Sequence, residues 1–190
     1  MNRRAVFLDR DGTLIHERHF LSRPEDLLLI EGAASALRLL KDRGLALVVL
    51  SNQSGVARGR FDLETVRLVN AALERQLLES GIELDGIYLC PHHPEGSVDE
   101  FTRACDCRKP APGLATQAAV ELDLKLDGSW IVGDKLSDVH MAKRLPLRPI
   151  LVRTGYGAES ERELGENAQV AVVEDIVEAA AYILRKEGAS

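Results

Sequence analysis

Short apolar runs alternate with longer helical patterns along this chain, and few folds accommodate such an alternation. The runs lie at residues 5–8, 45–50, 86–89, 130–132, 150–152 and 170–173, and they are continuous rather than interrupted at every second position. Continuous runs are typical of parallel strands that are buried on both faces of a sheet. Helical patterns occupy residues 33–42, 63–79, 113–122, 137–144 and 175–186, and Asp62 is a good N-cap for the second of them. The sequence therefore predicts an α/β fold with a doubly wound, mostly parallel, Rossmann-like sheet.

The domain organisation follows from length and spacing. The chain has 190 residues, which is the usual size of one domain, and it shows no repeat or Pro/Gly/Ser-rich linker. We expect a single domain over residues 1–190. The segments at residues 12–32 and 91–108 are too short for a cap domain, so we expect an open active site whose selectivity comes from loops.

Charge and hydropathy narrow the expected partners and location. The net charge is −6, which argues against nucleic acid or acidic membranes as partners. No signal-peptide hydrophobic region follows Met1, and no apolar run approaches the roughly 20 residues that cross a bilayer. We expect a cytoplasmic protein. No long amphipathic helix demands a partner, so a monomer is expected.

Polar residues follow the apolar runs at the points where the strands should end. Residues 9–13 (DRDGT) follow the first run, residues 51–55 (SNQSG) follow the second, and Gly133-Asp134-Lys135 follows the fourth. Ligands of open α/β sheets bind beyond the carboxyl ends of the strands. We therefore expect these three tips to converge on one site.

The residues at these tips are suited to phosphoryl transfer. One of Asp9 and Asp11 can attack phosphorus, while the other protonates the leaving oxygen and then deprotonates water. Asp134 would complete a hard oxygen site for Mg²⁺, which reduces the repulsion between a phosphate and an attacking carboxylate. Ser51 can hold a phosphoryl oxygen, and Lys109 supplies a positive charge. The alternative, that these are solvated turn residues, weakens because each tip follows a buried strand.

A cysteine and histidine cluster predicts a structural zinc site. All three cysteines lie close together, as Cys90-Pro91-His92 and, after a loop, Cys105-Asp106-Cys107. Four such ligands, Cys90, His92, Cys105 and Cys107, suit tetrahedral zinc in a reducing compartment, and His93 could replace His92. Zinc would fold the loop over about residues 90–107 and position the basic pair that follows it without taking part in the chemistry.

The four motifs together resemble the haloacid dehalogenase superfamily of phosphohydrolases. They are residues 9–13 (the family's DxDGT), Ser51, Lys109 and residues 133–138 (GDxxxD), and they span most of the chain in the family's order. The resemblance implies that Asp9 is the nucleophile and Asp11 the general acid/base. It also implies that Mg²⁺ is held by Asp9, the backbone carbonyl of Asp11, and Asp134, while Asp138 orients Lys109. The second aspartate of motif one favours phosphate ester hydrolysis over dehalogenation.

A narrower resemblance concerns the substrate. Residues 50–59, 90–96, 105–113 and 132–138 resemble the bacterial D-glycero-D-manno-heptose 1,7-bisphosphate 7-phosphatases. That family removes the C7 phosphate and leaves a heptose 1-phosphate for nucleotide-activated heptose. The implied substrate contacts come from Ser51, Asn52, Gln53, Ser54, Arg108, Lys109 and Lys135, and from a substrate loop formed by Glu17, Arg18, His19 and Phe20. Arg108 would contact the second, non-reacting phosphate, and the loop departs from the family's usual glycine–tyrosine pair.

Three other functions are compatible with parts of this pattern. A histidinol-phosphate phosphatase would share the four motifs and a similar zinc loop, but its monophosphate substrate gains little from Arg108. A nucleic-acid 3′-end phosphatase is disfavoured by the net negative charge. A zinc-stabilised binding module with a dead catalytic site has no need of the complete set of motif residues.

Overall fold

The computed structural model describes residues 3–165 and 169–188, and its strands form one parallel sheet. The sheet has six strands in the order β3-β2-β1-β4-β5-β6, and every neighbouring pair is parallel. The strands are β1 (Arg3–Leu8), β2 (Ala46–Asn52), β3 (Gly86–Cys90), β4 (Leu124–Gly133), β5 (Arg148–Val152) and β6 (Ala171–Val173). The helices are α1 (Ala33–Asp42), α2 (Ser54–Ala57), α3 (Leu63–Glu79), α4 (Gly113–Glu121), α5 (Leu136–Ala142), α6 (Gly157–Glu163) and α7 (Ile176–Glu187).

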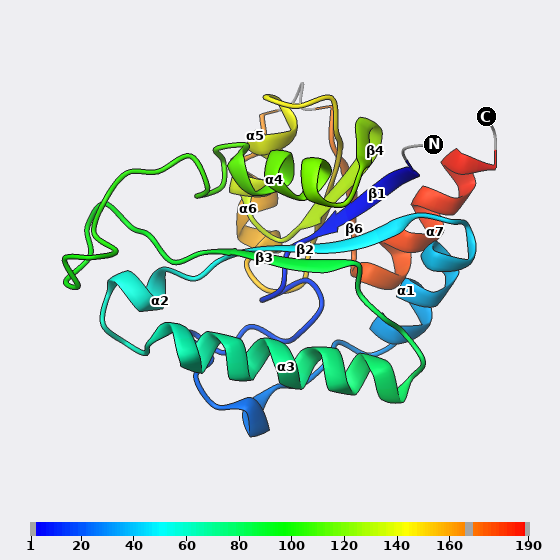
Figure 1. Cartoon of the computed structure of the whole chain (residues 1–190). Helices are drawn as coiled ribbons and strands as arrows, with labels where there is room; N and C mark the ends of the chain where they lie inside the picture. Colours follow the sequence, from blue (N-terminus) through cyan, green and yellow to red (C-terminus); the bar gives the residue numbers. More distant parts are fainter. Residues whose placement is uncertain (1–2, 166–168, 189–190) are drawn as a thin grey trace.

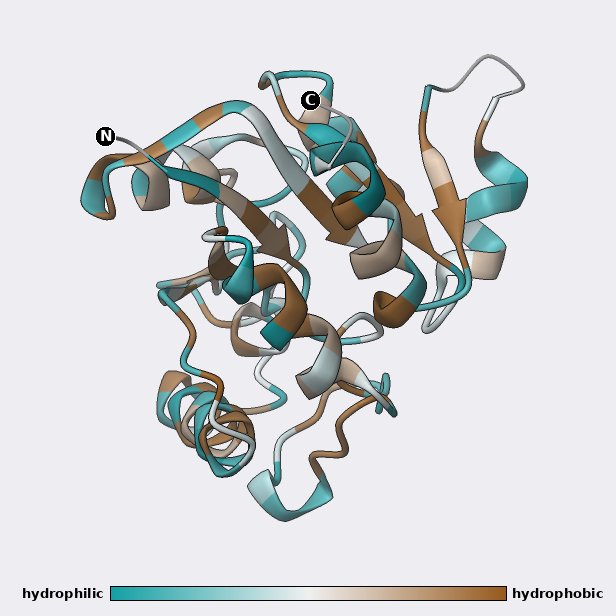
Figure 2. Cartoon of the chain, turned by 90° about the vertical axis from the view of Figure 1, so that its right-hand side faces the viewer, coloured by the Kyte–Doolittle hydropathy of each residue, from teal (hydrophilic) through white to brown (hydrophobic). Residues whose placement is uncertain are grey.

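Helices cover both faces of the sheet, as Figure 1 shows with the sheet close to edge-on. One face packs against α1, α3 and α7, and β1 contributes Val6 and Leu8 to that core. The other face packs against α4 and α5, and β1 contributes Ala5 and Phe7 to it. Figure 2 shows the strands as the most hydrophobic part of the ribbon. The doubly wound α/β fold is confirmed.

The predicted elements agree with the structure except at a few places. The helices predicted at residues 33–42 and 63–79 have those bounds, and the Asp62 carboxylate caps α3 by accepting the Thr65 N–H at 2.7 Å. The short helices α2 and α6 were not predicted. Strand β4 begins at Leu124, before the predicted run, because Leu124 and Lys125 pair with the start of β1 ahead of a register shift. At this irregularity the Ser129 hydroxyl accepts the Ala5 N–H at 2.9 Å.

The connections at the carboxyl edge contain no cap domain within the described residues. The β1–α1 connection is a loop with one 3-10 turn, Pro24–Asp26, and it packs Leu14 and Ile15 into the core. The β3–α4 connection is a long loop without helix or strand, which extends away from the sheet (Figure 1). None of the helices among residues 3–165 and 169–188 is both long and apolar enough to cross a membrane.

Candidate active site

A buried lysine joins the motif residues at the centre of the site. Lys109 is 3 % exposed, and its ammonium group donates to Asp9 Oδ1 at 2.7 Å, to Asp138 Oδ1 at 2.7 Å and to the carbonyl of Leu50 at 2.6 Å. Burial acts against the charged form, but the carboxylates of Asp138 and Asp9 outweigh it and raise the pKa of Lys109. The three acceptors come from the ends of β1 and β2 and from α5, so the sheet topology brings them together.

Two lysine charges keep the carboxylate of Asp9, the candidate nucleophile, ionised. Burial would raise the pKa of Asp9, but the charges of Lys109 and Lys135 outweigh it and hold that pKa below its usual value. The Lys109 hydrogen bond also fixes the orientation of the carboxylate. A buried, ionised and oriented carboxylate is a suitable nucleophile for phosphorus.

Three buried carboxylates form a group that fits a divalent cation. Asp9, Asp134 and Asp138 each offer an oxygen, and these oxygens lie within 4.8 Å of one another. Asp134 Oδ1 is buried and has no hydrogen-bond partner in the described part of the chain. Burial, together with the charge of Asp9, raises the pKa of Asp134 to about 8. A hard cation such as Mg²⁺ would satisfy the oxygen that lacks a hydrogen bond and compensate the crowded negative charge.

Two glycines allow a loop to pack against Asp134. Gly12 and Gly155 have φ values of +86° and +58°, and a Cβ atom on either would lie 2.2 or 2.3 Å from Asp134 Oδ2. The loop after β5 is fixed here because Thr154 Oγ1 donates to the Gly12 carbonyl at 2.6 Å and the Tyr156 N–H donates to Asp134 Oδ2 at 2.9 Å. This loop was not predicted from the sequence, although it follows a buried strand as the predicted tips do.

We expect Gly155→Ala to damage both stability and catalysis. The left-handed backbone alone costs roughly 1–2 kcal/mol for alanine, and the added methyl would also lie 2.6 Å from the Gly12 Cα. Overpacking of this kind adds about 1–3 kcal/mol, and displacement of Asp134 should lower kcat/KM. Urea unfolding and phosphate release measure the two effects.

Gly44→Ala is the matched control for this prediction. Gly44 is also left-handed, with φ of +76°, but a Cβ atom there would meet nothing within 4 Å. This variant should lose only the stability that a left-handed alanine backbone costs, and it should keep its kcat/KM. Equal losses of stability in the two variants, with activity unchanged in both, would contradict the assigned packing role of Gly155.

Asp11 lies at the edge of the site and is held by two side chains. Arg10, which is only 1 % exposed, donates from Nε to Asp11 Oδ2 at 3.0 Å and from Nη1 to Asn70 Oδ1 on α3 at 2.7 Å. Gln53 Nε2 donates to Asp11 Oδ2 at 2.9 Å and to Ser51 Oγ at 2.7 Å. The Asp11 carboxylate is thus next to Ser51 and outside the group of three carboxylates. Arg10 and Asn70 were not predicted as site residues.

Two adjoining cavities open beside these residues. A small cavity of about 30 Å³ is lined by Asp9, Asp11, Ser51, Asn52, Lys109, Lys135 and Ser137. A larger one of about 270 Å³ shares Asp11, Asn52 and Lys135 with it, and it adds Glu17, His19, Phe20, Leu21, Gln53, Ser54, Gly55 and Tyr156. Most of the predicted substrate contacts therefore line one continuous region. Arg18 and Arg108 do not line either cavity, and Tyr156 was not predicted.

Asn52 ties the loop that carries Lys109 to the sheet. Its side-chain amide donates to the Lys109 carbonyl at 3.0 Å, and its side-chain oxygen accepts the Lys109 N–H at 3.0 Å.

Arg108, which precedes Lys109, is partly buried, and this burial lowers the pKa of Arg108. One of its nitrogens, Nη1, donates to the His92 carbonyl at 3.3 Å.

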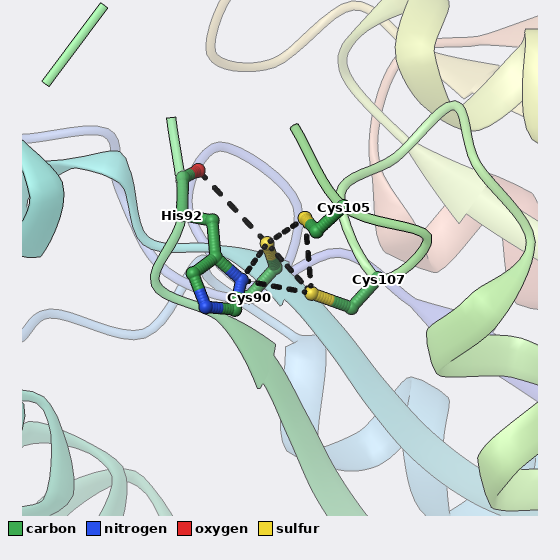
Figure 3. Close-up of side chains that lie close together, drawn as sticks. All are labelled: Cys90, His92, Cys105 and Cys107. Carbon is green, nitrogen blue, oxygen red and sulfur yellow. Dashed lines mark hydrogen bonds between the residues drawn. The ribbon is translucent and has the colours of Figure 1, made fainter. Parts of the chain in front are cut away.

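The predicted zinc ligands come together where β3 ends, Cys90 from the strand itself and the others from the loop that follows (Figure 3). The sulfur of Cys107 lies 3.1 Å from that of Cys90 and 3.2 Å from that of Cys105, and His92 Nδ1 lies 3.2 Å from the Cys107 sulfur. Sulfurs bound tetrahedrally at about 2.3 Å from zinc would be roughly 3.8 Å apart, so the group needs only slight expansion to hold the ion. His93 is elsewhere, with its Nε2 3.1 Å from Arg58 Nη2.

The fold and this carboxylate–lysine site define a class, the hydrolases of the haloacid dehalogenase type. The model of the HAD-hydrolase-like family matches residues 106–179. A structure of D,D-heptose 1,7-bisphosphate phosphatase from B. bronchiseptica, complexed with magnesium and phosphate, superposes with a TM-score of 0.86. It is 32 % identical in sequence, and the match covers 96 % of this chain and 99 % of that one.

Sequence relatives give the family within this class. D-glycero-β-D-manno-heptose-1,7-bisphosphate 7-phosphatase of Yersinia pestis is 43 % identical over 160 residues, which cover 84 % of this chain and 85 % of that protein. The protein of the same name from Haemophilus ducreyi is 40 % identical over 185 residues, which cover 96 % and 100 %. The chain belongs to the family of these heptose bisphosphate phosphatases, and it is a phosphoric monoester hydrolase.

Proposed function

We propose that this enzyme removes the C7 phosphate of D-glycero-β-D-manno-heptose 1,7-bisphosphate through an aspartyl-phosphate on Asp9. The product would be the heptose 1-phosphate that supplies nucleotide-activated heptose. The observation that carries the proposal is the buried Asp9 carboxylate, which is hydrogen-bonded to Lys109 and lies near the Asp134 oxygen that lacks a hydrogen bond, with Asp11 lining the same cavity. The substrate and its anomer follow the names of the relatives.

The proposed reaction has two steps. In the first, a carboxylate oxygen of Asp9 attacks phosphorus, the bond from phosphorus to the C7 oxygen breaks, and Asp11 protonates that oxygen. In the second, Asp11 takes a proton from water, the water oxygen attacks phosphorus, and inorganic phosphate leaves Asp9. Ser51 would hold a phosphoryl oxygen, and Lys109 would compensate the negative charge on the transferred group.

Two metals belong to the proposal. Mg²⁺, held by Asp9, Asp134 and the backbone carbonyl of Asp11, would reduce the repulsion between the phosphate and the Asp9 carboxylate. The magnesium in the B. bronchiseptica structure supports this choice. A structural Zn²⁺ would be held by Cys90, His92, Cys105 and Cys107, and thiolate ligands of this kind suit the reducing cytoplasm. We propose a single-domain, monomeric, cytoplasmic enzyme without nucleic-acid or membrane partners.

Phosphate release from a substrate panel tests this function. The panel contains both anomers of heptose 1,7-bisphosphate, fructose 1,6-bisphosphate, histidinol phosphate and a 3′-phosphorylated oligonucleotide, each with and without Mg²⁺. We expect the β-heptose bisphosphate to lead in kcat/KM by a factor of about ten or more. If histidinol phosphate led instead, the substrate assignment would be wrong while the phosphatase chemistry remained. No Mg²⁺-dependent turnover of any member would favour a binding module.

The role of Arg108 gives a separate prediction. A guanidinium recognises phosphate through paired hydrogen bonds, so Arg108→Ala should lower kcat/KM for the bisphosphate by about 10- to 100-fold. The same variant should hydrolyse phenyl phosphate, which has no second phosphate, at close to the wild-type rate. Parallel kinetics on the two substrates measure this difference. An equal loss on both would show that Arg108 does not recognise the second phosphate.

A further inference from the structure

Four residues on one wall of the larger cavity, Glu17, His19, Lys135 and Tyr156, contact one another in a closed ring. His19 Nδ1 lies 2.9 Å from the Tyr156 hydroxyl, and the Lys135 ammonium lies 4.7 Å from the centre of the Tyr156 ring. Glu17 closes the ring, because its Oε2 lies 3.4 Å from Lys135 Nζ and its Oε1 accepts the backbone N–H of His19 at 2.8 Å. All four residues line the cavity.

The substrate loop needs this support because its backbone is unfavourable. His19 and Phe20 have φ values of +50° and +71°, and neither is a glycine. Side chains in this left-handed region cost free energy, so two in succession persist only where the surroundings hold them. Phe20 packs edge-on against Phe61, with ring centres 6.4 Å apart, and His19 is held by Tyr156. Tyr156 therefore anchors the substrate loop on the side that faces Asp134 and the other two buried carboxylates.

The chemistry of the wall indicates what it recognises. Glu17 offers acceptors, Lys135 offers donors, and the Tyr156 hydroxyl can do both. The hydroxyl groups of a sugar also donate and accept, whereas the phenyl ring of phenyl phosphate does neither. The wall also lies beside the reaction centre, since the backbone N–H of Tyr156 holds Asp134.

We propose that Tyr156 is a specificity-determining residue, which anchors the substrate loop through His19 and presents a hydrogen-bonding wall to the polyhydroxylated part of a phosphorylated sugar. This inference rests on the proposed action on sugar phosphates. It adds a residue outside the four motifs, in the loop that follows β5.

Tyr156→Phe tests the proposal because it removes only the hydroxyl. The aromatic ring still faces the Lys135 ammonium, and the backbone N–H of residue 156 still donates to Asp134. We expect KM for the best sugar bisphosphate of the wild type to rise about fivefold to tenfold, with kcat within about twofold, since uniform binding is lost. Kinetic constants for phenyl phosphate should not change. Tyr88→Phe is the matched control, because its hydroxyl donates to Glu121 on α4 at 2.9 Å, and it should behave as the wild type on both substrates.

A double-mutant cycle with His19→Ala separates the possible outcomes. If Tyr156 acts through His19, the KM of the double variant should not exceed that of the worse single variant by more than about twofold. Multiplied effects would overturn the anchoring role. Equal losses on the sugar and on phenyl phosphate, or no loss on either, would overturn the specificity role. A wild type that prefers a substrate without hydroxyl groups would instead disprove the proposed function.

Discussion

Asp9→Asn should abolish turnover while leaving the fold intact. An amide cannot form the aspartyl-phosphate, so we expect kcat to fall by at least about 10⁴-fold. The amide has the shape of the carboxylate, and Lys109 keeps Asp138 and the Leu50 carbonyl as partners. The thermal midpoint should therefore stay close to that of the wild type. Phosphate release and thermal unfolding measure the two quantities on the same preparation.

A control and a direct assay make this prediction specific. Asp127→Asn removes a carboxylate on β4 whose side chain is 76 % exposed, and it should leave kcat unchanged. Wild-type enzyme that is quenched with acid during turnover should carry one phosphate on the peptide that contains Asp9, by mass spectrometry. Turnover by the variant clearly above that of a mock purification would show that Asp9 is not the nucleophile.

Cys107→Ser should remove zinc and stability together. The sulfur of Cys107 lies 3.1 Å from that of Cys90, 3.2 Å from that of Cys105 and 3.2 Å from His92 Nδ1. Structural zinc contributes its binding free energy to folding, so we expect the free energy of unfolding to fall by at least about 3 kcal/mol. In a chain of this size such a loss lowers the thermal midpoint by roughly 10 °C. Metal analysis should show zinc falling from one equivalent to none.

His93→Asn is the control for the zinc prediction. This neighbouring histidine contacts Arg58 rather than the sulfurs, so its replacement should keep both zinc and stability. Zinc loss in the His93 variant would mean that His93 is the fourth ligand. A Cys107 variant with full thermal stability and no zinc would show that the metal has no structural role.

The parts of the molecule that sequence predicts well are those set by local patterns. Helix α3 was predicted to the residue because its apolar period begins at a capping Asp62. The start of β4 was missed because Lys125-Leu126-Asp127-Gly128 has the composition of a turn. This segment belongs to a strand only because β4 pairs with β1 there, in a register that shifts part-way along. That pairing is a tertiary effect, which propensity does not record.

The same division holds for the candidate site. Asp9, Ser51 and Asp134 could be predicted because parallel strands bring their carboxyl ends to one edge. Asn70 and Tyr156 were missed, because each reaches the site from a distant segment and its contacts there are tertiary. Asn70 lies in the middle of α3, where nothing in the helical pattern shows that its side chain meets Arg10. Tyr156 follows β5, and its contact with His19 depends on how two loops cross.

The reciprocal pair between Asn52 and Lys109 bears on how enzymes of this architecture diversify. Asn52 at the end of β2 holds both the N–H and the carbonyl of Lys109. The position of this lysine therefore depends little on the part of the loop between His92 and Cys105. Residues 93–104 can therefore vary in length and sequence without moving the groups that act on phosphorus. Natural variation or loop grafting can therefore change this stretch of the surface while the reaction stays intact.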